Sequence, residues 1–144
     1  MTTSRLRTLM FLMINSAWFC AAQVTVIDSG STNLPGVNVK LQKSGPQALV
    51  EQRDGSQQKI MLDKDACKRL MTDLKAAGPL NELPAAHCMK SVSFGTSIFV
   101  EFNGVRSPDL SCRQTDPRAA ALKTDASEIL SAVRAKVPGK TVFR

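Results

Sequence analysis

The single histidine of the chain, His87, stands next to Cys88. A cysteine and a histidine act together as nucleophile and base only when the two side chains meet and the thiolate is exposed. Side chains of adjacent residues in an extended segment point to opposite sides of the backbone, so this pair is not placed for that chemistry. A serine–histidine–acid triad would need the same histidine, and the chain contains no Gly-x-Ser-x-Gly turn. These residues do not indicate a nucleophilic enzyme.

Metal and acid–base chemistry are equally weakly indicated. The run from Cys88 to Ser91 lacks the second cysteine of a zinc-binding Cys-x-x-Cys pair, and no acidic run has the spacing of a calcium-binding loop. Glu101 and Asp109 are candidate acids of a small hydrolase, but no partner carboxylate can be named for either. We therefore expect no metal and no cofactor, and a hydrolase ranks third among the function classes.

The first 22 residues are typical of a secretory signal peptide. Arg5 and Arg7 form a positive start, residues 9–14 and 17–19 are apolar, and residues 20–22 offer small side chains for cleavage before Gln23. The apolar run is shorter than the roughly 20 residues of a membrane-spanning helix, so we expect no stable membrane anchor after cleavage. Residues 23–144 suit a single domain that is secreted or periplasmic.

The mature chain is mildly basic. The signal peptide carries two arginines and no acidic residue, so the formal net charge of +7 falls to +5 on cleavage. No Lys/Arg run is longer than Lys68-Arg69, and the positive charges are spread along the chain. A nucleic-acid partner would call for a basic patch, and none is indicated.

Three cysteines follow the cleavage site: Cys67, Cys88 and Cys112. In an exported protein an odd number predicts one disulfide and one remaining thiol, and the sequence alone leaves three pairings open. Cys67 falls in the apolar stripe of a predicted helix, which is the usual place of a buried structural thiol. We therefore favour a Cys88–Cys112 bridge.

The bridge would bracket a β-hairpin. Residues 97–102 are rich in β-branched and aromatic side chains, and Asn103-Gly104 is a strong signal for a two-residue turn. Pro108 should end the return strand early or confine it to a sheet edge. Small and polar residues flank the hairpin, and we take the following as a candidate binding loop: Ser93, Phe94, Gly95, Asn103, Gly104 and Arg106.

The remaining patterns predict an α+β fold. Short strands are expected at residues 24–27, 37–41, 47–53 and 56–62, with an Asp54-Gly55 turn, so that the sheet has about five or six antiparallel strands. A helix capped by Asp63 or Asp65 should end at Gly78-Pro79, and a second should run from Pro117 to Lys136 after an Asp116 cap. Both helices are amphipathic and should pack on the sheet. The last residues, 140–144, are expected to be frayed.

The segment CMKSVSFGTS (88–97), the closing SPDLSC (107–112) and the N-terminal DSGSTNLPG (28–36) resemble an uncharacterised family of small exported bacterial proteins. The resemblance implies an exported domain and carries no activity or catalytic residue across. The sequence thus favours an exported, non-enzymatic binding domain whose partner is an extracellular or envelope protein or polymer. An inhibitor of secreted proteases is the alternative.

Overall fold

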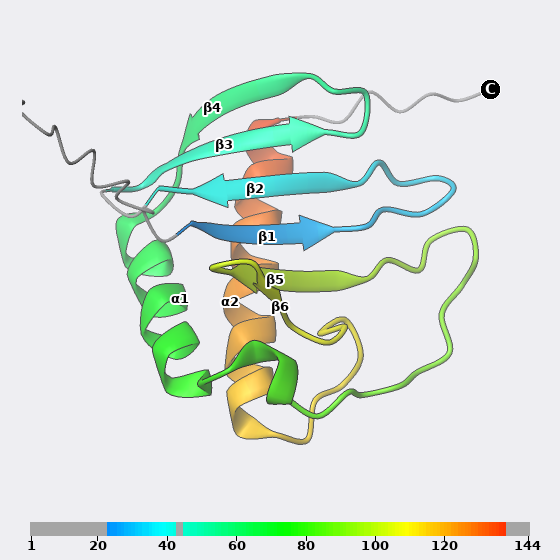
Figure 1. The fold of residues 1–144 in the computed structure, drawn as a ribbon. Coiled ribbons are helices and arrows are strands. Elements are labelled where there is room, and N and C mark those ends of the chain that lie inside the picture. The colour runs from blue at the N-terminus through cyan, green and yellow to red at the C-terminus, as the bar shows by residue number, and fades with distance from the viewer. Residues whose placement is uncertain (1–22, 43–44, 138–144) are drawn as a thin grey trace, which may run out of the picture.

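A computed structural model describes residues 23–42 and 45–137 (Figure 1). The predicted signal peptide and the expected frayed tail lie outside the described residues. The elements are, in chain order, β1 (Val24–Asp28), β2 (Val37–Leu41), β3 (Gln47–Gln52), β4 (Gln57–Met61), α1 (Lys64–Ala77), the short 3-10 helix η1 (Leu80–Glu82), β5 (Ile98–Phe102), β6 (Val105–Arg106) and α2 (Pro117–Lys136).

The strands form one antiparallel sheet in the order β4-β3-β2-β1-β5-β6. β1 to β4 are a meander, and the β5–β6 hairpin is added beside β1, so the first strand lies in the middle of the sheet. In register, Val26 of β1 stands between Val39 of β2 and Val100 of β5. The expected α+β fold, with a six-stranded sheet, two helices and one disulfide, is confirmed.

Buried and partly exposed side chains alternate along the strands, so the two faces of the sheet differ. Val24, Val26 and Asp28 of β1 are buried toward the helices, whereas Thr25 and Ile27 point to the opposite side and stay partly exposed. In Figure 1 α2 lies behind the strands and crosses them, and neither α1 nor α2 covers the near face. The core therefore sits between one face of the sheet and the helices, and we call the uncovered side the open face.

The helices begin and end at the residues that the sequence indicates. The Asp63 carboxylate accepts a hydrogen bond from the Ala66 N–H at 2.8 Å, and Asp116 caps α2 by accepting from the N–H groups of Arg118 and Ala119. Gly78 takes φ 71° directly after α1, the left-handed region that favours glycine. The apolar side of α2 is buried, and so is the residue that follows the helix: Leu122, Ala126, Ile129, Leu130, Val133 and then Val137.

The hairpin turn has the expected backbone, but its second strand is short. Asn103 and Gly104 have φ values of 51° and 79°, as a two-residue turn of this kind requires. β6 ends at Arg106, two residues before Pro108. The chain then stays beside β5, since Ser107 exchanges hydrogen bonds with Val100 and the Leu110 N–H donates to the Ile98 carbonyl at 2.8 Å. The buried hydrogen bonds between Ser107 and Val100 thus take the place of the β-ladder, which Pro108 cannot extend because it has no N–H group.

No helix among the described residues is long and apolar enough to cross a membrane.

Candidate binding surface

Two loops far apart in the sequence lie side by side at one end of the sheet: residues 29–36, between β1 and β2, and residues 88–97, before β5 (Figure 1). We call them the loop pair. Ser29 and Ser97 are joined twice, with Ser29 N donating to Ser97 O and Ser97 N donating to Ser29 Oγ, both at 2.9 Å. Three further bonds reach the carbonyls of Val92 and Ser93, from Ser31 Oγ, Thr32 Oγ1 and Asn33 N. The loops therefore hold each other in place.

Glycine allows the first loop to fold this tightly. Gly30 has φ 67°, and a Cβ built on it would stand 2.3 Å from Gly36 N and 2.6 Å from Leu34 O. These are backbone atoms that cannot move aside without opening the loop. Gly95 is similarly enclosed in the second loop, where an added Cβ would lie 2.4 Å from the Ser91 carbonyl oxygen. Both loops therefore need glycine at a contact point and have closely defined backbones.

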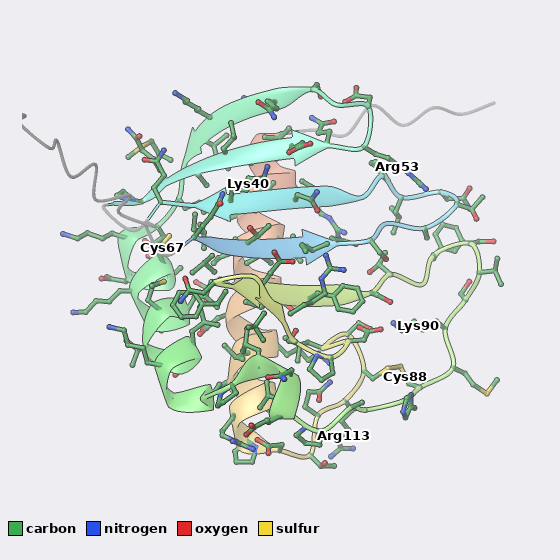
Figure 2. The ribbon with its side chains drawn as sticks, viewed as in Figure 1. Lys40, Arg53, Cys67, Cys88, Lys90 and Arg113 are labelled. Carbon is green, nitrogen blue, oxygen red and sulfur yellow. A yellow bond between two sulfur atoms is a disulfide. The ribbon has the colours of Figure 1, made fainter. Side chains whose placement is uncertain are left out.

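The second loop is also tied to the segment that follows the hairpin. Cys88 forms the predicted disulfide with Cys112, and the Lys90 ammonium group pairs with the Asp109 carboxylate and donates to Ser97 Oγ at 2.7 Å. Figure 2 shows Cys88 and Lys90 on the long segment that leads from η1 to β5. The loop is thus fastened at both residues that flank Met89.

Asp109 is the centre of this attachment. Besides Lys90, it accepts hydrogen bonds from the backbone N–H groups of Ser111 at 2.9 Å and Ile98 at 3.2 Å. Partial burial works against ionisation, but the hydrogen bonds from Lys90 and Ser111 prevail and hold the pKa of Asp109 well below its usual value. The Asp109 carboxylate therefore stays charged, and paired with Lys90, at acidic pH values at which an ordinary aspartate is protonated.

Large apolar side chains project from this fastened loop. Met89 is fully exposed, Val92 is 87% exposed and Phe94 is 64% exposed. Elsewhere in the described residues large exposed apolar side chains are only Met61 on β4 and Val105 on β6. Isolated exposed apolar residues are ordinary, but three within six residues of a constrained loop are typical of a contact surface.

The structure divides the candidate binding loop that the sequence indicates. Ser93, Phe94 and Gly95 belong to the loop pair, whereas Asn103 and Gly104 form the turn at the other end of β5, about 17 Å away for a five-residue strand. Arg106 lies on the open face, 5.5 Å from the centroid of the Phe99 ring and 3.4 Å from a Glu101 carboxylate oxygen. Sequence proximity places these residues in one unit, but the hairpin carries them to separate surfaces.

A cavity of about 220 Å³ lies behind the first loop, beside the end of α2. Its wall is mostly apolar: Leu34, Pro35, Gly36, Val37, Val50, Gln52, Val133, Arg134 and Val137. Arg134 is already engaged, because its guanidinium binds the buried carboxylate of Asp28 at the end of β1. Asp28 also accepts from the Gly30 N–H at 2.9 Å, so this ion pair joins the sheet, the first loop and α2.

Chemically reactive groups are not gathered here. His87 is exposed and Cys88 is consumed by the disulfide. Among residues 23–42 and 45–137 no group of three or more His, Cys, Asp or Glu side chains could hold a metal ion. Cys67 is the remaining thiol in the described chain, and it lies half-buried on α1 away from the loops (Figure 2). Burial, with a smaller effect of Asp63, raises the pKa of the Cys67 thiol. Within the described residues, this arrangement presents exposed side chains for binding and brings no cysteine–histidine pair together.

No protein-family model, no curated protein and no solved structure matches this chain.

Proposed function

We propose that the chain is an exported, non-enzymatic binding domain that recognises an extracellular or envelope protein through the second loop of the loop pair. The observation that carries this proposal is the exposure of Met89, Val92 and Phe94 on a loop whose backbone is already fixed. Binding by an ordered loop avoids most of the entropy lost when a flexible segment becomes ordered. Apolar side chains held out in this way are suited to enter pockets on a partner.

The attachments of the loop support an exported location. A disulfide is stable in oxidising compartments and rare where thiols are kept reduced, and Cys88–Cys112 holds the loop that carries the apolar side chains. The predicted signal peptide has the same implication. In a reducing compartment the loop would lose one of its two fastenings.

The hydrolase alternative has less support. Glu101 pairs with Arg106 on the open face, and Asp109 is committed to Lys90, Ser111 and Ile98. Neither carboxylate is paired with the second acid that such chemistry needs. Their contacts are those of structural residues.

A pull-down tests the proposal. Purified, oxidised residues 23–144 would be immobilised and incubated with envelope and culture-supernatant fractions of the producing cells. We expect a saturable protein partner that is lost on Phe94→Asp and on reduction of the disulfide. Met61→Asp is the matched control, because Met61 is an exposed apolar residue on the far edge strand β4. Binding that survives Phe94→Asp, or that Met61→Asp weakens equally, would contradict the proposal.

A further inference from the structure

Six consecutive residues around Met89 form a continuous exposed segment, from His87 to Val92. The segment follows η1 and reaches the first residue of the turn at residues 92–94, and it forms neither helix nor strand. A serine protease cleft binds a segment of its substrate with one side chain inserted in the specificity pocket. Met89 is the fully exposed side chain in this segment, and three of the six residues lie on each side of the Met89–Lys90 bond.

The two residues that flank Met89 are both fastened to the same scaffold segment. Cys88 is bonded to Cys112, and Lys90 is paired with Asp109, three residues earlier in that segment. The two sides of the Met89–Lys90 peptide bond are therefore held independently. Gly95 N also donates to the Ser91 carbonyl at 2.7 Å, which fixes the chain that follows. If this bond were cut, both new ends would stay where they are.

From this geometry we infer that the segment 87–92 is a substrate-like loop that inhibits serine endopeptidases with an apolar specificity pocket, with Met89 as the side chain that enters the pocket. This inference rests on the proposed binding function and names its partner class. An unbranched, flexible methionine fits an apolar pocket and does not fit one built around a carboxylate.

The chemistry of inhibition follows from the two fastenings. The protease serine hydroxyl attacks the Met89 carbonyl carbon, and the hydroxyl proton passes through the protease histidine to the backbone nitrogen of Lys90. The Met89–Lys90 peptide bond then breaks, which leaves an ester at Met89 and a free backbone amine at Lys90. Because Lys90 remains paired with Asp109, the amine is not released and can attack the ester to reform the peptide bond. Hydrolysis of the ester by water gives a Met89 carboxylate and a backbone ammonium group at Lys90. The disulfide and the Lys90–Asp109 pair still hold these two ends together. The protease thus stays occupied, because the two cut ends do not separate from each other.

The test uses the oxidised protein, residues 23–144, against chymotrypsin, subtilisin and trypsin. We expect one-to-one inhibition of the first two and at least a hundredfold weaker inhibition of trypsin. Met89→Arg should reverse this order, and Met89→Asp should abolish inhibition of all three. Met61→Arg, at an exposed methionine on β4, should leave the wild-type pattern unchanged. A change of specificity at a single position cannot result from unfolding.

The Lys90–Asp109 ion pair provides a second, independent test of the inference. With Asp109→Asn, the inhibitor should become a substrate, so that the nicked form, heavier by one water and cut between Met89 and Lys90, accumulates many times faster than with wild type. Absence of inhibition of chymotrypsin and subtilisin, or failure of Met89→Arg to inhibit trypsin, would overturn the inference. The proposed function fails separately, when no Phe94-dependent partner is captured. A captured partner whose binding is indifferent to Met89 overturns the protease inference alone.

Discussion

The carboxyl group of Asp125 on α2 faces that of Asp73 on α1 across the contact between the two helices. Asp125 is 5% exposed, and no donor among the described residues reaches its Oδ2 atom. Arg69 Nε is 4.0 Å from Asp125 Oδ1, but Arg69 binds Glu128 more closely, at 2.7 Å. Burial first, and then the neighbouring Asp73, raise the pKa of Asp125 to about 6. Two carboxyl groups can share a hydrogen bond only when one of them is protonated. Asp125 therefore keeps its proton at weakly acidic pH, where an ordinary aspartate has lost it.

This pair should make the protein less stable as the pH rises. The folded chain binds the Asp125 proton up to about pH 6, whereas the unfolded chain releases it near pH 4, so the free energy of unfolding should fall between these values by about 3 kcal/mol. Asp125→Asn should remove most of this decline. Urea denaturation at intervals from pH 4 to pH 7.5 measures it. Asp65→Asn, in the exposed first turn of α1, is the control and should keep the wild-type slope.

Removing the disulfide should weaken the fold considerably. The bridge joins residues 24 positions apart, and loss of a closed loop of this size lowers the free energy of unfolding by about 3–4 kcal/mol. We expect Cys88→Ser/Cys112→Ser to lower the Tm by roughly 10–15 °C. Reduction of the wild type should produce the same shift in a thermal melt. An unchanged Tm would mean that the hydrogen bonds of the loop pair hold the segment without the bridge.

Gly30 and Gly55 both have positive φ, 67° and 81°, but only Gly30 is enclosed. An alanine Cβ at position 30 would overlap the backbone of Gly36 and Leu34, whereas nothing lies within 4 Å at position 55. Gly55→Ala should cost about 1 kcal/mol for the backbone conformation alone. Gly30→Ala should cost at least about twice as much, because the clash adds to the same strain. Chemical denaturation of the two variants gives the comparison, and equal losses would contradict the packing of the first loop.

The three cysteines of residues 23–144 should differ in their reactivity toward an alkylating reagent. Without reduction, residues 23–144 should take up one alkyl group, on Cys67, and after reduction and unfolding three. Because burial and Asp63 raise the pKa of Cys67, its reaction with iodoacetamide at pH 7 should be slower than that of a free cysteine and should accelerate above pH 9. Mass spectrometry of the intact and digested protein measures both. Label on Cys88 or Cys112 in the oxidised protein would contradict the pairing.

Local signals predict most of the elements and their ends. The alternation of Val37, Val39 and Leu41 predicts β2, the Asp116-Pro117 pair predicts the start of α2, and Asn103-Gly104 predicts the hairpin turn. Each of these features depends on residues close together in the sequence. The disulfide is also predictable, because Cys67 occupies the apolar side of a helix and leaves Cys88 and Cys112 as the pair.

Features that depend on sequence-distant residues have no local pattern that predicts them. Nothing in the run from Ser29 to Gly36 indicates that it binds the backbone of Val92 and Ser93, because the bonds go to carbonyl groups that every sequence possesses. Nothing in the sequence indicates that Met89 is exposed either, since methionine is usually a core residue. Asp125 lies within the buried side of α2, and its neighbour Asp73 is on another helix. The sequence therefore indicates part of the candidate surface, at residues 93–95, whereas the contact between the two loops and the exposure of Met89 are visible only in the structure.

The central position of β1 has a consequence for the order in which the chain can fold. β1 is the first strand to become available from the N-terminus, yet one of its two neighbours, β5, begins at Ile98. Until that strand arrives, one edge of β1 keeps a row of unpaired N–H and C=O groups. Closing the sheet requires the pairing of β1 with β5, a contact between sequence-distant residues that is slow to form. The edge of β1 that later pairs with β5 is therefore open to pairing with another chain until residues 98–102 are in place.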